Sequence, residues 1–226
     1  MKVRLNKYIA NCGVCARRKA DELIRQGKVK VNGKTVVDLA TKVDIDKDVV
    51  EVEDRLLDYK KRKEDKIYIA LYKPRGYVST TRKYKNEKNV LDLVDTDDRL
   101  YPAGRLDKDS EGLIILTNDG EYANLITHPR YEHEKEYIVW IDKPLKDQDI
   151  LRVQKGIEVD GISYPVKRIK KISSRKINII LTQGKKRHIR VIFKYLGYQV
   201  ERLLRVRIDN IRLGKLMPGQ WRKISL

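Results

Sequence analysis

Two residues of opposite charge flank a single leucine in the segment 104–112: Arg105 precedes Leu106, and Asp107 follows it. Glycines begin and end this segment, and the apolar run 113–116 that comes next is short and branched enough to predict a buried strand. A carboxylate that a turn presents beside a strand can act as a nucleophile or as a general base. Most aspartates in such turns only hydrogen-bond their own backbone, so the local sequence by itself favours a structural role.

The net charge of the chain is +19 over 226 residues, and a hydrophobic content of 41% is enough for a packed core. A field of this sign concentrates polyanions at the surface, so nucleic acid is the expected partner. The positive excess is segregated: residues 1–34 hold ten Lys or Arg against two acids, and residues 160–226 hold eighteen against three. This distribution predicts two basic surfaces that grip one nucleic acid molecule.

Membrane and export functions find no support in the chain. No apolar run approaches the roughly 20 residues that span a bilayer, and Asn6, Lys7 and Asn11 interrupt the place where a signal peptide would have its apolar region. We therefore expect a cytoplasmic protein that binds no membrane. Cys12 and Cys15 have the spacing of a redox or zinc motif, but the chain lacks a second pair, so we interpret them as small residues of a helix turn.

The N-terminal part predicts two helices followed by a hairpin. Apolar residues recur at helical spacing in 4–11 and in 16–26, and a glycine follows each segment. Two short β-branched runs then flank Asn32-Gly33, which is the strongest short hairpin signal. The nearly all-charged stretch 54–66 lacks core spacing and predicts a linker. We therefore predict one domain at residues 1–60 and a second at residues 61–226.

The segments 4–9 (RLNKYI), 13–20 (GVCARRKA) and 27–34 (GKVKVNGK) together resemble the alpha-L RNA-binding domain, the module named after ribosomal small-subunit protein four. In that family the second helix and the hairpin present a basic face to structured RNA. A solvated basic face is the alternative, but the cations here cluster instead of alternating with acids. The resemblance implies RNA contacts by Arg4, Lys7, Arg17, Arg18, Lys19 and Lys30.

Residues 61–226 predict more strands than helices, joined by short links, which is typical of an α+β domain on a mostly antiparallel or mixed sheet. Helical spacing occurs in 121–127, 147–154 and 188–196. Strands are predicted where β-branched and aromatic residues gather, at 67–72, 77–80, 113–116, 137–141, 162–166, 177–182 and 199–208.

Four separated segments of this second domain carry a further resemblance: 73–76 (KPRG), 104–110 (GRLDKDS), 133–137 (HEKEY) and 184–190 (GKKRHIR). In order and spacing they resemble the motifs of bacterial ribosomal-RNA pseudouridine synthases that carry an N-terminal alpha-L domain, the RsuA/RluB/RluF family. Within that family the residues of these motifs most resemble those of the large-subunit (23S) branch, RluF. The resemblance covers nearly the whole chain and implies an isomerase.

The implied reaction detaches a uracil from its ribose, turns it and rejoins it through carbon, and it requires no metal or cofactor. By resemblance Asp107 is the essential carboxylate, which either attacks the anomeric carbon or assists proton removal there; the sequence leaves both routes open. Arg190 would be its ion-pair partner and keep it charged. Tyr137 would lie against the uracil ring, and Leu203 would pack on the base. Asp109, in contrast, is interpreted as local turn chemistry.

A uridine in folded RNA must be unstacked and flipped into the pocket. Arg105 stands two residues before Asp107, and we hypothesise that its side chain fills the gap or holds the displaced strand. Phosphate contacts that position the RNA without reading its sequence are predicted from the basic run 167–176 and from a second group. This second group consists of Lys185, Lys186 and Arg187.

The chain departs from the family at three positions next to Arg190. Relatives usually have Gln where His188 stands and Arg-Met where Val191 and Ile192 follow. These changes put RNA contacts in doubt more than chemistry. We interpret His188 as a surface or helix-face residue.

We expect a monomer that isomerises one uridine in 23S ribosomal RNA, near the peptidyl transferase centre. One alternative is a non-catalytic RNA-binding or ribosome-assembly protein that kept the fold, and the presence of Asp107, Tyr137 and Arg190 argues against it. The same chemistry on 16S ribosomal RNA is a second alternative, and the same chemistry on tRNA is a third. Readout in folded RNA depends on loop shape and splayed bases, which the sequence does not reveal.

Overall fold

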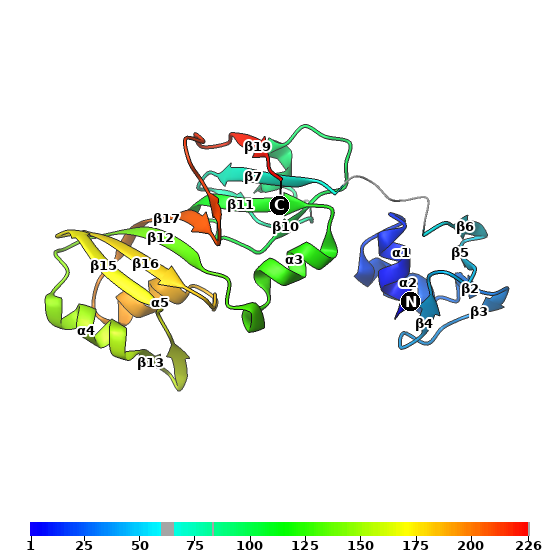
Figure 1. Ribbon diagram of the computed structural model, residues 1–226, viewed down its shortest axis with the longest axis horizontal. Helices are drawn as coiled ribbons and strands as arrows, with labels where there is room; N and C mark the ends of the chain where they lie inside the picture. The colour runs from blue at the N-terminus through cyan, green and yellow to red at the C-terminus, as the bar shows by residue number, and fades with distance from the viewer. Residues whose placement is uncertain (60–65, 83, 226) are drawn as a thin grey trace. The chain divides into compact units, whose positions relative to one another are not determined.

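The structure is a computed structural model that describes residues 1–59, 66–82 and 84–225. The chain divides into two compact units, Met1–Asp65 and Lys66–Leu226, and we describe each by itself (Figure 1). The predicted linker 54–66 was wrong at its start, because residues Arg55–Leu57 form a strand that pairs with Val50–Val52 and buries Leu57. Residues 60–65 of that stretch lie outside the described residues. The division after residue 60 therefore stays a prediction.

The first unit packs two short helices, α1 (Leu5–Asn11) and α2 (Arg17–Arg25), against small sheets. Both helices lie where the apolar spacing predicted them. Their buried faces, which include Ile9 and Ile24, share one core with the strand residue Val29. The strands form the sheets β1-β4 and β3-β2-β5-β6, with bounds β1 (Lys2–Arg4), β2 (Val29–Val31), β3 (Lys34–Thr35), β4 (Lys42–Asp44), β5 (Val50–Val52) and β6 (Arg55–Leu57).

The turns of this unit follow from residues that accept a positive φ. Gly13 (φ +75°) ends α1 after the cap residue Cys12, and Cys15 lies in the same turn; both cysteines pack against the core, as expected for helix-turn residues. Asn32-Gly33 adopts φ of +50° and +77° between β2 and β3, which confirms the predicted hairpin.

The second unit is built on a nine-stranded mixed sheet, which confirms the predicted α+β class. Its order is β15-β16-β12-β17-β11-β7-β19, with β10 beside β11 and β18 beside β17 (Figure 1). Only β11 and β17 are parallel among these described pairs. The bounds are β7 (Tyr68–Lys73), β10 (Tyr101–Ala103), β11 (Glu111–Thr117), β12 (Lys135–Ile141), β15 (Arg168–Ser173), β16 (Lys176–Leu181), β17 (Val200–Ile208), β18 (Ile211–Arg212) and β19 (Trp221–Lys223).

Helices cover different halves of this sheet. On one half, α4 (Asp147–Lys155) and α5 (His188–Tyr195) share a buried cluster with alternate residues of β12. On the other half, α3 (Gly120–Thr127) packs its Ile126 against β11. The remaining elements are short: the strand pairs β8 (Tyr77–Val78) with β9 (Lys88–Asn89) and β13 (Ile157–Val159) with β14 (Ile162–Tyr164), and the 3₁₀ helices η1 (Val90–Leu93) and η2 (Pro129–Tyr131). Among the described residues no helix is long and apolar enough to cross a membrane.

Gly112 permits the parallel contact between β11 and β17. It has φ +108°, and a Cβ atom placed there would lie 2.3 Å from the carbonyl oxygen of Arg205 and 2.7 Å from its nitrogen. Real Cβ atoms do not approach backbone so closely, so only glycine fits. This contact matters for the site because β11 begins directly after the Asp107 segment.

Substituting alanine for Gly112 should therefore destabilise the second unit by about 3 kcal/mol or more, since both strain and a backbone clash oppose it. Gly161→Ala is the matched control: Gly161 also has a positive φ (+71°), but nothing lies within 4 Å of its Cβ position. Its cost should be only about 1–2 kcal/mol. Urea unfolding of both variants measures the difference, and equal losses would contradict this account of Gly112.

Candidate active site

The turn that carries Asp107 is held by its backbone. The Ser110 N–H donates to the Asp107 carbonyl at 3.0 Å and closes the turn, and the Gly76 N–H donates at 2.7 Å to the carbonyl of the residue after Asp107. The buried Ser79 hydroxyl donates to the Leu106 carbonyl (3.0 Å) and accepts from the Leu106 N–H (3.2 Å). The turn is thus fixed to the segment that follows β7. The motif 73–76 (KPRG) begins at the last residue of β7 and continues into this segment.

Asp107 is half-buried at the wall of an open depression of about 540 Å³. Among the described residues no Lys or Arg forms an ion pair with it. Cations nevertheless outnumber carboxylates around it. The lining residues are Arg75, Gly76, Asp107, Lys108, Asp109, Lys186 and Arg187.

Asp109 forms ion pairs with two arginines for which the sequence predicted other partners: Asp107 for Arg190 and RNA phosphates for Arg187. Its Oδ2 lies 3.3 Å from Nε of Arg190 and 3.3 Å from Nη2 of Arg187, and the Asp109 carbonyl accepts from Nη2 of Arg190 at 3.1 Å. Two predictions were therefore wrong: Arg190 does not pair with Asp107, and Asp109 is more than local turn chemistry. The cause is the tight turn, which separates the two carboxylates so that α5 meets the second of them.

Arg190 is well buried, with 12% of its side chain exposed, and its Nη1 donates to the Val200 carbonyl at 2.9 Å. Burial lowers the pKa of this guanidinium, and Asp109 opposes that shift. Asp107 also raises the pKa of Arg190, so the two charges act on each other through space although they form no ion pair. A guanidinium stays protonated under all these influences, so Arg190 supplies a fixed positive charge beside both carboxylates.

Tyr137 and Leu203 belong to one apolar cluster, and their contact with uracil stays a prediction. Tyr137 on β12 and Leu203 on β17 are each 7% exposed and share an apolar cluster with Leu106, the residue before Asp107. Arg205 stands opposite Tyr137 in the sheet, and its Nη1 donates to the carbonyl of Arg105 at 3.4 Å. The structure thus connects the aspartate segment to both predicted uracil contacts, while the Arg105 side chain itself is exposed.

Lys73 belongs to the same arrangement and was not predicted as a site residue. Its side chain is fully buried, and its Nζ donates to the carbonyls of Pro74 (2.9 Å) and Ser110 (2.6 Å). It thereby joins the end of β7 to the end of the Asp107 turn. Loss of solvation on burial lowers the pKa of Lys73 to about 8, with a partial opposing effect from Asp109.

This pKa predicts a pH effect on stability. Because the pKa is about 8 in the folded protein and 10.5 for an ordinary lysine, the unfolded state binds more protons between these values, and stability should rise with pH across the window. The gain from Lys73 should approach about 3 kcal/mol. It should be missing from Lys73→Met, in which Lys135, whose pKa is also lowered to about 8 by burial, still titrates. Urea unfolding from pH 7 to 10 tests this, and parallel pH curves for the two proteins would contradict it.

We expected His188 to be a surface or helix-face residue; it does lie on helix α5, but it is buried. It begins α5 and is 4% exposed, with its ring edge-to-face against Tyr164 at 5.1 Å between centroids. Burial lowers its pKa to about 4, so it is neutral near pH 7. The neighbouring Lys185 donates to the Ser163 carbonyl at 2.6 Å, whereas Lys186 and Arg187 line the depression. His188 therefore packs the base of the loop that carries these cations.

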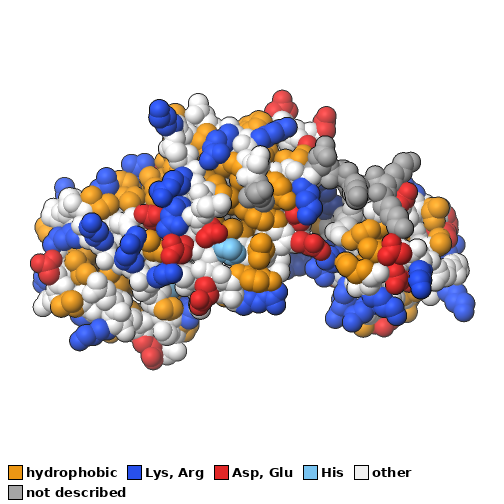
Figure 2. All heavy atoms as spheres, viewed as in Figure 1, with side chains coloured by type: hydrophobic (Ala, Val, Ile, Leu, Met, Phe, Trp, Pro, Cys, Tyr) orange, Lys and Arg blue, Asp and Glu red, His pale blue; other side chains and the backbone are white. Residues whose placement is uncertain are grey.

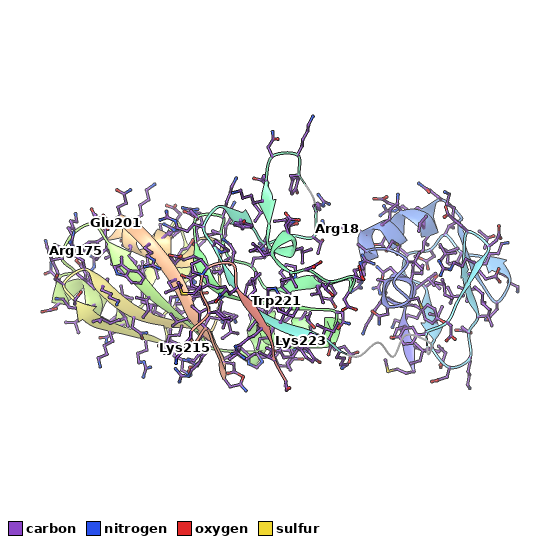
Figure 3. All side chains as sticks on the ribbon, turned by 90° about the horizontal axis from the view of Figure 1, so that it is seen from above. Arg18, Arg175, Glu201, Lys215, Trp221 and Lys223 are labelled. Atoms are coloured by element: carbon purple, nitrogen blue, oxygen red, sulfur yellow. The ribbon has the colours of Figure 1, made fainter. Side chains whose placement is uncertain are left out.

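In the first unit, several predicted RNA-binding cations already have protein partners. Lys30 pairs with Asp54 (2.8 Å) and Lys19 with Glu22 (3.0 Å). Arg17 donates to the Asn6 side chain at 3.3 Å and Arg4 to the Leu39 carbonyl at 3.4 Å. Arg18 is exposed on α2 and projects from it (Figure 3). RNA contacts by these residues and by Lys7 stay predictions.

The chain belongs to the RNA pseudouridylate synthase family, whose model matches residues 67–195, and is therefore an RNA-modifying isomerase. The S4 domain family, the alpha-L module of the sequence analysis, matches residues 3–50. Both predicted resemblances are confirmed, and the chain is a pseudouridine synthase.

Individual relatives match nearly the whole chain. The dual-specificity RNA pseudouridine synthase RluF of Escherichia coli O6:H1 is 43% identical over 99% of this chain and 76% of its own length. The ribosomal large subunit pseudouridine synthase B of Bacillus subtilis is 39% identical over 98% and 92%. A crystal structure of a pseudouridylate synthase superposes with a TM-score of 0.71 at 29% identity and covers 99% of this chain and 96% of that one.

Proposed function

We propose that this pseudouridine synthase isomerises one uridine in 23S ribosomal RNA, near the peptidyl transferase centre, and that Asp107 carries the reaction. The observation that supports the role of Asp107 is its place: a half-buried carboxylate without an ion-pair partner among the described residues, at the wall of a cation-rimmed depression. The name of the Bacillus subtilis relative, a ribosomal large subunit pseudouridine synthase, supports a large-subunit RNA as the substrate.

The reaction is a redox-neutral isomerisation. The bond between uracil N1 and the anomeric carbon breaks, the base turns, a bond from C5 to the same carbon forms, and the C5 proton leaves while N1 gains one. Asp107 either attacks the anomeric carbon and is later displaced or assists proton removal from the sugar. Both routes need an ionised carboxylate, and the fixed positive charge of Arg190 lies beside the Asp107 turn through its contact with Asp109. Tyr137 lies against the uracil ring, and Leu203 packs on the base.

The rim has a separate task. Lys186, Arg187, Lys108 and Arg75 surround the depression, and their charges would hold the phosphates on either side of the flipped nucleotide. These phosphate contacts do not depend on the RNA sequence, and the four cations take no part in breaking or forming bonds. Steep loss of binding with added salt is the expected consequence.

Arg105 is exposed beside the Asp107 turn, while its carbonyl is held by Arg205. We therefore assign its side chain to the flip, where it fills the gap that the uridine leaves. Arg105→Ala should lower turnover at saturating RNA by about tenfold to 100-fold, because flipping costs a few kcal/mol and loses its support. Rates on a folded transcript are compared with rates on a short single-stranded one, which needs no flip from a stack. Intact binding and turnover with both RNAs would remove Arg105 from the mechanism.

The substrate is tested by incubating the protein with unmodified transcripts of 23S RNA, 16S RNA and tRNA. Pseudouridine is then mapped by carbodiimide-dependent stops of reverse transcription. One stop in the 23S transcript is expected. A stop only in 16S RNA or tRNA would overturn the substrate but keep the chemistry, and the absence of any stop would favour a non-catalytic RNA-binding protein.

A further inference from the structure

Among the described residues of the second unit, no helix covers one face of one half of the main sheet. Strand alternation places Tyr137 in the cluster shared with α4 and α5, so Ile138 and Trp140 lie on the opposite face of β12. The register aligns Ile138 with Leu204 and then with Glu111, and α3 packs on that face only beyond β17, against β11. We call the part that β15, β16, β12 and β17 form the open sheet face.

Trp140 lies near the end of β12 on the open sheet face, between two cations. Lys176 on β16 and Arg202 on β17 are its direct partners in the register. The Lys176 ammonium is 5.2 Å from the centre of the indole ring, and the Arg202 guanidinium is 4.7 Å from it. Both distances fall within the range of cation–π contacts. The three side chains form a polar and aromatic row across the strands, and that row is half-exposed to exposed.

The edge strand β15 adds unengaged charge to the open sheet face. The side chains of the basic run 167–176 lie on both faces of the sheet. Lys171 is on the face that α4 covers, where it pairs with Asp147 of α4 at 2.9 Å. Arg168 and Lys170 alternate with it, are exposed, and have no ion pair among the described residues. Ile172 follows them with 49% of its surface exposed. Figure 2 shows Lys and Arg side chains interspersed with hydrophobic ones over this half of the second unit.

The carboxylates near the open sheet face are mostly neutralised. Glu136 accepts from Asn178 (2.7 Å) and Arg207 (2.6 Å), and Glu111 accepts from Arg202. Glu201 lies at the end of the unit where Arg175 stands in the turn between β15 and β16 (Figure 3). Cations without a carboxylate partner therefore dominate, and the complementary ligand is a polyanion.

We propose that the open sheet face binds the substrate RNA, as a second contact surface on the side of the sheet opposite Tyr137. Arg168 and Lys170 contact phosphates, and Trp140 and Arg202 supply an indole and a guanidinium plane on which unpaired bases stack, with the Lys176 ammonium beside them. A charged patch alone would attract any polyanion, whereas the aromatic row fits single-stranded segments of a folded RNA. The proposal rests on RNA as the substrate but not on the role of Asp107.

The first test is charge reversal at two exposed positions, Arg168→Glu with Lys170→Glu. The matched control is Lys155→Glu with Lys194→Glu, which changes the net charge equally on exposed positions of α4 and α5. With unmodified 23S and 16S transcripts, the first variant should bind the tighter of the two RNAs at least about tenfold more weakly than the unaltered protein. The slope of log Kd against log salt should fall by about 2. The control should stay within about threefold.

A second readout observes Trp140 directly. The chain has two tryptophans, and the other one, Trp221, lies on β19 at the opposite edge of the sheet (Figure 3). In Trp221→Phe, Trp140 is the only indole, and its emission should be quenched by RNA over the concentrations at which binding occurs. The proposal is overturned if the β15 variant binds RNA like the control variant, or if saturating RNA leaves Trp140 emission unchanged. A failure of turnover mapping with intact binding would concern the proposed function alone.

Discussion

Asp107→Asn is expected to lower kcat by about 10³-fold or more, while the Kd for RNA stays within a few-fold of its original value. An amide of the same size can neither attack the anomeric carbon nor accept a proton. The substitution should not disturb folding, because the Asp107 carboxylate has no ion-pair partner among the described residues and its turn is held by backbone contacts. Release of tritium from RNA labelled at uridine C5 measures the rate, since the C5 proton is lost in the reaction.

Asp160→Asn is the matched control for this experiment. It makes the same chemical change at an exposed position with a positive φ (+52°) in the turn between β13 and β14, where asparagine is well tolerated. Its rate should equal that of the unaltered protein. A comparable loss of rate in both variants would show that net charge, and not the Asp107 carboxylate, governs turnover.

Asp109→Asn should lower kcat by about 100-fold with a smaller change in KM. The substitution removes the negative charge that holds both Arg190 and Arg187, and a displacement of about 1 Å in groups near the reacting atoms costs a factor of this size. Asp109 acts through these arginines and is therefore a positioning residue. Because Arg190 is well buried, its lost partner should also lower stability by roughly 1–3 kcal/mol.

A purely structural role for Asp109 can be distinguished from positioning. Asp109→Glu keeps the charge and should recover part of kcat, whereas Asp109→Asn should not. In a double-mutant cycle, Arg190→Lys and Asp109→Asn should be strongly non-additive in kcat, because either change disrupts the same pair. Additive effects, or an Asp109→Asn variant with full kcat, would refute this role.

Periodicity and turn chemistry were sufficient for most regular elements. Alternating or continuous apolar residues located β12 and β17, and helical spacing located α5 to within one residue. The strand β15 was not predicted because its sequence, RIKKIS, has one buried residue, Ile169, among charged ones. That strand is stabilised by pairing with β16 and by contact with α4, and a local pattern contains neither.

The sequence predicted several residues of the site, but it did not predict which of them form ion pairs with each other. Asp107 and Asp109 stand two residues apart in one turn, and nothing in their spacing shows which of them Arg190 meets. Lys73 ends a strand, where a lysine ordinarily reaches solvent; it is buried because two backbone carbonyls accept from it. Arg205 was likewise missed, because its place opposite Gly112 follows from the pairing of two strands that are far apart in the sequence.

The central claim is that the Asp107 carboxylate performs the isomerisation. The most direct measurement is a pseudouridine map of a full unmodified 23S transcript after prolonged incubation with saturating protein, with and without Asp107→Asn. Saturation removes differences in binding, and prolonged incubation exposes slow residual chemistry. We predict a carbodiimide-dependent stop at one uridine with the unaltered protein and none with the variant. A stop at the same uridine with Asp107→Asn would contradict the account.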